Sequence, residues 1–216
     1  MSESAKTAAG PGLISDYPDS AVAEAFRTLR TNIQFSSVDR ELKAILVLAV
    51  GRSPRPELVA ANLAISFADV GRRTILVDCD LREPRLQATF ALAGEQGLTT
   101  LILEEQAQPP LRDTGIPNLS LLASGPVPPN PADILASDRM ARVVNRLRED
   151  ADMVVLYGSP AATASDALAL APRVDGVLLV VEAGQTRRDA ARAAAEGLAR
   201  VGARVLGVVL NNVKRS

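Results

Sequence analysis

Two aspartates, Asp78 and Asp80, stand one residue apart at the end of an apolar run that begins at Thr74. Paired carboxylates of this kind bind Mg²⁺ or form ion pairs with arginine, so they are the first residues with chemistry to assign. The loop 51–57 is the second candidate, because it joins an apolar run to a helical pattern, which is where α/β folds bind phosphate. This loop lacks the residues that phosphate binding needs.

The elements that must position these residues alternate along the chain. Strands are predicted at 44–50, 74–80, 119–123, 153–156, 176–182 and 204–210. Helices are predicted from Ser20 onward and at 56–70, 97–104, 138–149, 166–171 and 187–201, with a loop at 109–118 and an extended segment at 124–131. This alternation predicts an α/β fold with a doubly wound, mostly parallel sheet and helices on both faces. Ligand sites in such a fold lie where the strands end, here at 51–57, 78–85, 157–160 and 211–212.

Length and composition indicate one domain. The chain has 216 residues, of which 47% are hydrophobic, enough to bury one sizeable core. We therefore expect a single domain at 21–216. A mobile arm is expected at 1–20, where small and polar residues follow one another without periodicity.

Composition also excludes several function classes. The net charge of −1 gives no reason to expect nucleic acid as a partner, and the absence of histidine removes histidine catalysis and histidine metal ligands. The single cysteine, Cys79, allows no disulfide within the chain and fits a cytoplasmic location. No apolar run approaches the roughly 20 residues of a membrane span, so a membrane role is expected to require a partner.

The first predicted helix carries a charged stripe beside its apolar face. Glu24, Arg27 and Arg30 form this stripe in the pattern Glu-x-x-Arg-x-x-Arg. One interpretation is a solvated face, supported by an ion pair between Glu24 and Arg27. The other interpretation is a surface that docks on another subunit.

Six segments in order carry a further signal: 24–35, 61–64, 76–85, 114–119, 125–131 and 208–211. Together they resemble the bacterial tyrosine kinases of capsule and exopolysaccharide synthesis, the CpsD/CapB type. The resemblance covers about residues 17–212 and implies the P-loop NTPase-like fold of the deviant ATPases that include MinD and ParA. The segment Gly-Pro-Val-Pro-Pro-Asn-Pro at 125–131 favours the kinase branch, because MinD and ParA do not share it.

The nucleotide loop departs from the family's pattern. The resemblance implies a loop that begins near Gly51 and ends in Gly-Lys-Ser or Gly-Lys-Thr; with Asn62 aligned, these last positions fall on Arg55, Pro56 and Glu57. A phosphate site needs backbone N–H groups at a helix start, a lysine for charge and a hydroxyl for Mg²⁺. Pro56 supplies neither an N–H group nor a charge, and Glu57 places an anion where phosphate would lie. The loop is therefore predicted to be a capped helix start.

The end of the fourth strand departs as well. The family's Asp-Thr-Pro-Pro, whose aspartate supports Mg²⁺, is replaced by Tyr-Gly-Ser-Pro, so Tyr157 stands at the Walker B position. These kinases also phosphorylate a tyrosine cluster in their own C-terminal tail, whereas the tyrosines of this chain are Tyr17 and Tyr157. Because phosphoryl transfer depends on positioning and charge, loss of lysine, hydroxyl and carboxylate together predicts loss of catalysis.

Other family positions are retained. Asp78 and Asp80 match an acidic pair expected near Mg²⁺ and near the attacking tyrosine, and Asn211 matches a position that contacts the adenine base, although it fits a turn equally well. The charged stripe matches the motif through which family members assemble into rings. With the other ligands missing, we expect the two aspartates to form ion pairs that stand in for Mg-ATP, with Arg52, Arg55, Arg82 or Arg85 as partners.

These departures predict a pseudokinase, a catalytically inactive relative that acts as an oligomerising scaffold or regulatory subunit in polysaccharide synthesis or export. We expect no metal and no nucleotide cofactor. The resemblance implies three partners: a second copy, an active kinase paralogue, and the cytoplasmic tail of a membrane chain-length regulator. One alternative is an active kinase or ATPase that binds Mg-ATP through Arg52 or Arg55. Another alternative is a positioning protein of the MinD or ParA type.

Overall fold

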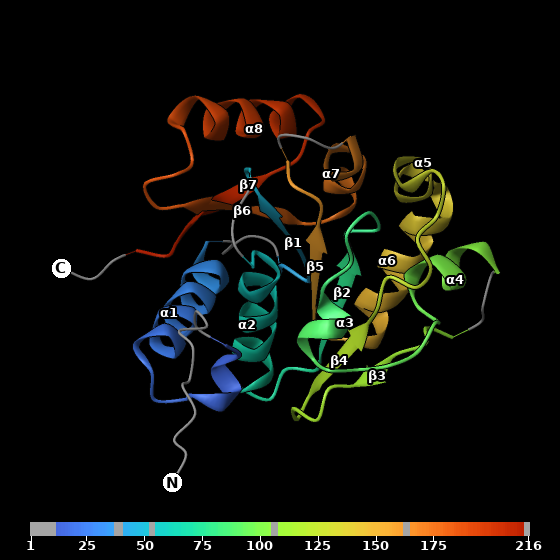
Figure 1. Ribbon diagram of the computed structural model, residues 1–216, viewed down its shortest axis with the longest axis horizontal. Coiled ribbons are helices and arrows are strands. Elements are labelled where there is room, and N and C mark those ends of the chain that lie inside the picture. Colours follow the sequence, from blue (N-terminus) through green and yellow to red (C-terminus); the bar gives the residue numbers. More distant parts are fainter. Residues whose placement is uncertain (1–11, 37–40, 52–54, 105–107, 162–164, 214–216) are drawn as a thin grey trace, which may run out of the picture.

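The computed structural model describes residues 12–36, 41–51, 55–104, 108–161 and 165–213, and the structural statements below refer to these ranges. Their strands form one sheet (Figure 1). The strands are β1 (Ala44–Ala49), β2 (Thr74–Cys79), β3 (Arg112–Asp113), β4 (Leu119–Leu122), β5 (Met153–Gly158), β6 (Gly176–Glu182) and β7 (Val205–Asn211). The helices are α1 (Ala21–Phe35), α2 (Glu57–Ala68), α3 (Leu86–Thr89), α4 (Leu98–Leu103), α5 (Pro131–Ala136), α6 (Asp138–Asp150), α7 (Ser165–Leu170) and α8 (Arg188–Arg200), with 3-10 segments η1 (Ile14–Asp16) and η2 (Ala171–Arg173).

The strand order across the sheet is β3-β4-β2-β5-β1-β6-β7. β1 pairs in parallel with β5 and β6, β2 pairs in parallel with β4 and β5, and β7 pairs in parallel with β6. Within the described ranges, β3 is the one antiparallel strand, and it pairs with β4. Every residue of β1, β2 and β5 is buried, as expected for parallel strands covered on both faces. The predicted α/β fold with a mostly parallel sheet is confirmed.

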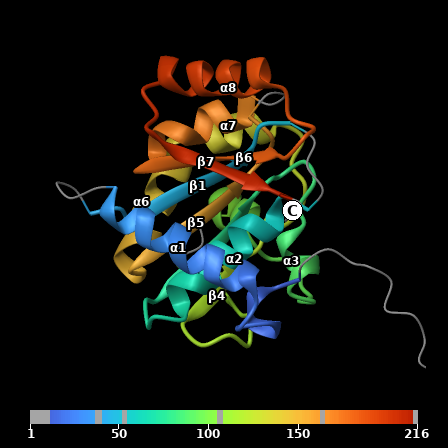
Figure 2. The ribbon, with the colours of Figure 1, turned by 90° about the vertical axis from the view of Figure 1, so that its left-hand side faces the viewer.

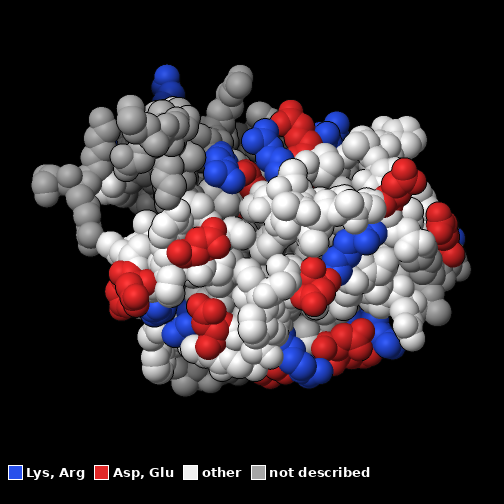
Figure 3. Space-filling model, turned by 60° about the horizontal axis from the view of Figure 1, so that its bottom comes forward, with Lys and Arg blue, Asp and Glu red and all other residues white. Residues whose placement is uncertain are grey.

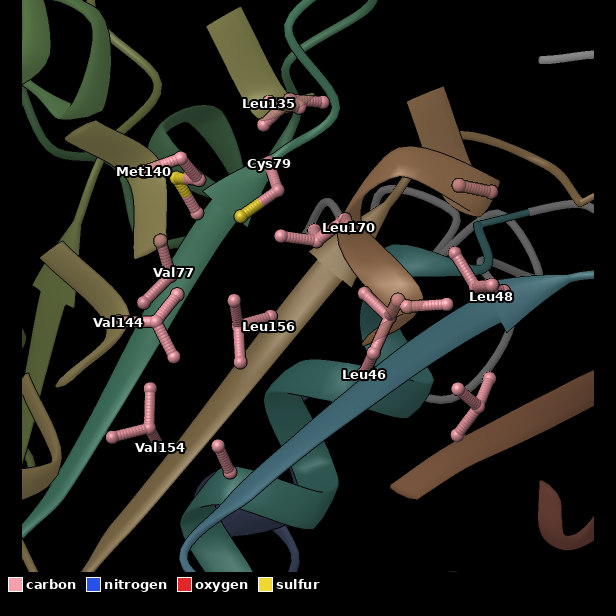
Figure 4. Packing of buried hydrophobic residues seen from close by; sticks show 14 of the residues in the cluster. Leu46, Leu48, Val77, Cys79, Leu135, Met140, Val144, Val154, Leu156 and Leu170 are labelled. Carbon is pink, nitrogen blue, oxygen red and sulfur yellow. The ribbon is translucent and has the colours of Figure 1, made fainter. Parts of the chain in front are cut away.

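Helices cover both faces of the sheet, with α1 and α2 on one side and α8 on the other (Figures 1 and 2). Successive residues of β1 point to opposite faces, so Ile45 packs in the core beside α2 and Leu46 packs in the core beneath α7. Figure 4 shows the second core, in which the strand residues meet Leu135 of α5, Met140 and Val144 of α6, and Leu170 of α7.

The helix α2 follows the candidate nucleotide loop and packs against the sheet. All of its residues are buried, because α1 packs on it from one side while β2 and β5 contact it from the other. Helices that are apolar on every side are buried in this way. The first residue of α2 is Glu57, so the burial of the helix also fixes the position of that carboxylate.

Several short elements were not predicted, among them η1 in the N-terminal arm. The helix α5 begins directly at Pro131, a residue suited to the first position of a helix because its missing N–H group would have no partner there. The strand β3 lies within the predicted loop 109–118, and α3 follows the acidic pair. The strand β5 also continues to Gly158, beyond its predicted end at 156.

The described part of the N-terminal arm is held against α2. Ile14 is buried, its N–H group donates to Oδ1 of Asn62 at 2.9 Å, and Nδ2 of Asn62 donates to the carbonyl of Gly12 at 3.3 Å. Arg27 of α1 adds a bond to the carbonyl of Pro18 at 2.7 Å. In the described part of the predicted arm, a buried asparagine amide thus supplies both a donor and an acceptor to the backbone. Residues 1–11 lie outside the described ranges, and the mobility of the arm stays a prediction.

No helix in the described ranges combines the length and the apolar character needed to cross a bilayer. On the face shown in Figure 3, Lys and Arg are interspersed with Asp and Glu. A face of mixed sign produces no extended positive field that would attract a polyanion.

Candidate functional site

The parallel strands bring the predicted site residues to one edge of the sheet. We call this the carboxyl edge, and its residues are Gly51, 55–57, 78–86, 157–160, Asp166, Glu182 and Asn211. In the register of β2 and β5, Asp78 lies opposite Tyr157 and Cys79 lies opposite Gly158. The structure therefore places the retained aspartate directly beside the residue that replaces the family's Walker B aspartate.

The start of α2 satisfies its own backbone groups. The N–H group of Leu58 donates to the carbonyl of Arg55, and that of Val59 donates to the carbonyl of Pro56, both at 3.1 Å. Arg55 has a φ of +52°, a left-handed conformation that favours glycine, which is the residue the family has at this position. The loop thus keeps a glycine-like backbone bend while using helix-start N–H groups that an anion would need.

Glu57 is buried at this helix start, with 4% of its surface exposed. Its Oε1 lies 3.5 Å from Nε of Arg55, at the outer limit of a hydrogen bond. Its Oε2 is buried and has no hydrogen-bond partner among the described residues. A buried carboxylate oxygen without a donor is unfavourable, so this oxygen calls for an explanation.

Asp78 is fully buried and organises the turn that follows β2. Its carboxylate accepts hydrogen bonds from the N–H groups of Arg85 at 2.9 Å, Leu86 at 2.8 Å and Asp80 at 3.2 Å. Burial raises the pKa of Asp78 to about 7, although these three bonds oppose the shift, and the charge of Asp80 adds to it. The contacts of this aspartate are therefore structural: it folds the chain from β2 back onto α3.

Asp80 contacts the end of β5. Its Oδ1 accepts a hydrogen bond from the hydroxyl of Ser159 at 2.7 Å and another from the N–H group of Glu83 at 3.3 Å. Ser159 lies in the segment that replaces the family's Asp-Thr-Pro-Pro. The ends of β2 and β5 are thus joined by a hydrogen bond from a neutral hydroxyl group.

The predicted ion pairs between the acidic pair and nearby arginines are wrong for the described arginines. Arg82 binds Asp166, Arg85 binds Glu83 at 2.9 Å, and Arg55 reaches only Glu57. The reason is geometric: Asp78 and Asp80 are buried and accept from backbone N–H groups and from the Ser159 hydroxyl, whereas the side chains of these arginines are about half exposed. Arg52, the fourth predicted partner, lies outside the described ranges.

Asp166 is a site residue that sequence reasoning missed. It is 1% exposed and accepts from Arg82 through both carboxylate oxygens, at 2.7 Å and 3.0 Å. The hydrogen bond to Asp166 raises the pKa of Arg82. The available signal was an aspartate in the first turn of a predicted helix, but such residues also serve as ordinary helix starts.

Tyr157 is 2% exposed and packs its ring in the core on the α2 side of the sheet. Burial raises its pKa strongly, and the negative charges of Asp80, Glu57 and Asp78 raise it further. The phenol is therefore neutral at physiological pH. Where the family has a carboxylate, this chain has an uncharged aromatic residue that cannot support a metal ion by charge.

Asn211 ends β7 at the same edge. Its Nδ2 donates to Glu182 at 3.4 Å, and Nδ2 of the neighbouring Asn212 donates to the other oxygen of Glu182 at 2.7 Å. These contacts agree with the interpretation of Asn211 as a residue that closes a turn. They leave its predicted contact with an adenine base as a prediction.

The charged stripe of α1 makes contacts within the chain. Arg27 pairs with Glu24 at 3.1 Å; the Glu24 side chain is exposed and that of Arg27 is half-buried. Arg30 donates to the carbonyl of Ser66 at 2.5 Å and so fastens α1 to α2. Both sequence interpretations survive, because the ion pair leaves a charged surface while Arg30 has a structural contact.

No group of three or more Asp, Glu or Cys side chains in the described part of the chain is placed to hold a metal ion. The acidic residues of the carboxyl edge instead accept from backbone, hydroxyl, amide or guanidinium donors, as described above. At the family's ligand positions this edge has Pro56, Glu57 and Tyr157.

The fold defines the class of protein. The structure superposes on the septum site-determining protein MinD of Pyrococcus horikoshii, complexed with Mg-ADP, with a TM-score of 0.67 at 21% identity, covering 81% of this chain and 72% of that one. At this identity the likeness shows the fold alone. The chain is thus an α/β protein with the P-loop NTPase-like fold of the MinD and ParA superfamily.

Similarity to sequences narrows the class, although no family model matches the chain. The chain is 36% identical to the tyrosine-protein kinase YwqD of Bacillus subtilis over 200 residues, which cover 92% of this chain and 84% of that protein. It is 31% identical to the tyrosine-protein kinase CpsD of Streptococcus agalactiae over 195 residues, covering 89% and 84%. The chimerical protein CapA2B2 matches with a TM-score of 0.88 and 31% identity, covering 94% and 89%. The chain belongs to the family of these bacterial tyrosine-protein kinases, as its sequence segments indicated.

Proposed function

We propose that this chain is a non-catalytic member of the tyrosine-protein kinase family that acts through protein contacts in capsular or exopolysaccharide synthesis. The polysaccharide setting follows from the family resemblance. The loss of catalysis follows from the chemistry of the carboxyl edge.

The observation that carries the proposal is the buried carboxylate of Glu57 at the start of α2. This position corresponds to the hydroxyl residue of the family's nucleotide loop. Two like charges about 4 Å apart repel by roughly 4 kcal/mol at an effective dielectric constant of about 20, and a nucleotide brings several negative charges to such a loop. A fixed anion at this place therefore opposes nucleotide binding.

The backbone of the loop supports the same conclusion. Pro56 has no N–H group, and the N–H groups of Leu58 and Val59 already donate to loop carbonyls. A phosphate group would have to compete with these internal bonds. No lysine is present in the segment 51–57 to compensate by charge.

Tyr157 stands in place of a third group that catalysis needs, the carboxylate at the end of β5. Phosphoryl transfer needs charge stabilisation by metal ions and their carboxylate supports, and the neutral phenol supplies none. Lysine, hydroxyl and carboxylate are thus missing from three separate positions.

Protein contacts are assigned to the charged stripe of α1. Glu24 and Arg27 form an ion pair at the surface, so a second copy of the chain or an active kinase paralogue can exchange these pairs across an interface. The cytoplasmic tail of a membrane chain-length regulator is the further partner that the family resemblance supplies. A subunit of this kind would support assembly without consuming ATP.

Titration calorimetry of the full chain with ATP and with ADP, each with and without Mg²⁺, tests the proposal. We expect no heat of binding at millimolar nucleotide. Magnesium-dependent binding in the micromolar range would overturn the proposal and restore the alternative of an active kinase or ATPase with an atypical loop.

A further inference from the structure

The two outer strands of the sheet are protected to different degrees against pairing with another chain. β3 lies at one side of the strand order; it is two residues long, and both of its residues are charged. β7 lies at the other side, and its seven residues include no proline and no charged side chain. Short length, charge and proline are features by which proteins prevent an outer strand from pairing with another chain. β7 has none of the three.

The side of β7 that faces away from β6 is open. Figure 2 shows β7 at the front of the molecule, with α8 above it and α1 below it. The carbonyl of Asn211 accepts from the N–H group of Ala183, directly after β6, at 3.0 Å. Backbone groups of successive residues in a strand point to opposite sides, so those of Leu210 and Val208 point away from β6. A strand with such open donors and acceptors can bind a further strand.

Apolar side chains are exposed on the same strand. Val208 is 57% exposed and Leu210 is 55% exposed, whereas every residue of β1 is buried. In the register with β6, Val208 lies beside Leu179, whose side chain packs in the core on the α8 side of the sheet. A strand added next to β7 would place its own side chains beside Val208 and Leu210 and remove apolar surface from water.

β7 is already held in the conformation that strand pairing needs. Its register with β6 is regular from Gly207 to Asn211, and the irregularity in this pairing is confined to the start of the strand. At the other end, Glu182 accepts hydrogen bonds from the amides of Asn211 and Asn212. A strand that is ordered before binding loses little conformational entropy when a second strand is added.

We propose that β7 pairs with β7 of a second copy of this chain. The two strands run antiparallel about a two-fold axis at Val208, and the two sheets become continuous. This inference goes beyond the proposed function and does not depend on it, because strand pairing requires neither the loss of nucleotide binding nor the charged stripe of α1.

A second copy fits this surface because the strand is its own complement. In a two-fold antiparallel pair, the open N–H and C=O groups of each strand meet those of the equivalent strand. A two-fold axis brings each side chain near its own copy, so a charged strand would repel itself, whereas β7 is uncharged. With Val208 opposite its equivalent, Arg204 lies opposite Asn212, and no like charges face each other there.

The first test measures the molar mass of the full chain by light scattering over a range of concentrations. It uses Arg27→Glu as the background, which removes the charged stripe as a second interface. This chain should be a dimer, and adding Val208→Lys and Leu210→Lys should halve its mass. The matched control adds Val70→Lys and Leu103→Lys instead, at a valine and a leucine that are 52% and 56% exposed on α2 and α4, and should leave the mass unchanged.

The second test is a disulfide between copies. In the proposed pairing, residue 208 faces its own equivalent at a Cα separation of about 5.5 Å, which a disulfide can span. Val208→Cys should therefore form a covalent dimer when copper phenanthroline is added, and the dimer is seen on a non-reducing gel. Val70→Cys is the control for random collision, and the native Cys79 is buried.

A monomer in the Arg27→Glu background at every concentration would overturn the inference, as would equal cross-linking of Val208→Cys and Val70→Cys. If the double lysine variant does not fold by circular dichroism, the cysteine test decides. The two proposals fail separately. Binding of ATP refutes the proposed function and leaves the pairing of β7 intact, whereas loss of the β7 dimer without ATP binding refutes only this inference.

Discussion

Arg82 holds Asp166 with two hydrogen bonds, Nε to Oδ2 at 2.7 Å and Nη2 to Oδ1 at 3.0 Å. This ion pair joins the turn after β2 to α7. Arg82, which was expected to bind Asp78 or Asp80, therefore binds a carboxylate of a neighbouring helix. Asp80 is left to Ser159, and Asp78 to backbone N–H groups. Among the described residues, the carboxyl edge is thus joined by these contacts and not by the predicted ion-pair network.

The Arg82–Asp166 pair is asymmetric, which gives a first prediction. The Arg82 side chain is 52% exposed and that of Asp166 is 1% exposed. Arg82→Ala should lower the Tm more than Asp166→Asn, because the first leaves a buried carboxylate unpaired and the second leaves a cation that water can solvate. Thermal unfolding followed by circular dichroism provides the comparison. Arg85→Ala is the control, because it breaks an exposed pair, and it should change stability by less than about 1 kcal/mol. A larger drop in Tm for Asp166→Asn than for Arg82→Ala would refute the argument.

Asp78 gives a second prediction. Asp78→Ala removes the acceptor of the N–H groups of Arg85 and Leu86, and each buried unsatisfied group costs about 1–3 kcal/mol. The free energy of unfolding should fall by about 2–5 kcal/mol at pH 6, with or without ATP. Urea denaturation measures this loss, with Glu83→Ala as the control for an exposed carboxylate. Unchanged stability of Asp78→Ala would show that the turn after β2 does not depend on this side chain.

The raised pKa of Asp78 predicts a pH dependence of stability. The carboxyl group titrates near about 3.9 in an unfolded chain, whereas burial raises the folded pKa to about 7. Between these values the folded state binds a proton that the unfolded state has released, so this group's contribution to stability is fully present below about pH 4 and is lost as the pH rises through 7. The difference in unfolding free energy between the wild type and Asp78→Ala should therefore decrease as the pH rises from about 4 to about 8. A difference that stays constant with pH would contradict it.

The charged stripe predicts an effect on assembly. The double variant Arg27→Glu, Arg30→Glu should lower the molar mass measured by light scattering, because each substitution reverses a charge that a partner meets. Arg30 also bonds to Ser66 of α2 and Arg27 to the carbonyl of Pro18, so each stripe variant must retain the wild-type Tm for its mass to be interpreted. The double variant Arg142→Glu, Arg188→Glu makes the same charge change on α6 and α8 and should leave the mass unchanged. An unaltered mass in the stripe variants would remove α1 from consideration as an interface.

Restoring the missing groups predicts a gain of nucleotide binding. The combination Arg55→Gly, Pro56→Lys, Glu57→Ser and Tyr157→Asp should bind ATP in a magnesium-dependent manner. Residue 55 has a φ of +52°, which glycine adopts more easily than arginine does. Arg55→Gly should therefore relieve backbone strain. Calorimetry under the conditions used for the wild type measures the gain. A folded variant that still binds no ATP would show that the obstacle lies outside these four positions.

Much of the fold could be predicted because apolar runs and helical patterns alternate strictly along the chain. The strands at 44–50, 74–80 and 176–182 each contain a run of apolar residues, and such runs form parallel strands covered on both faces. The short elements could not be predicted in the same way. The four residues of α3 and the two of β3 carry too little periodicity, and they are ordered by their neighbours rather than by their own sequence.

The sequence by itself determined the alternation of strands and helices, the absence of lysine, hydroxyl and carboxylate from the family's nucleotide positions, and the family to which the chain belongs. Only the tertiary structure decided which partner each charged side chain has. Several arginines and carboxylates end at the same edge, and any pairing among them is compatible with the sequence. Strand register and the turn after β2 select one set of contacts, giving Asp78 to backbone N–H groups and Arg82 to Asp166, and leaving one oxygen of Glu57 without a donor in the described chain. Hydrogen bonds act over only about 3 Å, so that selection depends on positions in space that the order of residues does not contain.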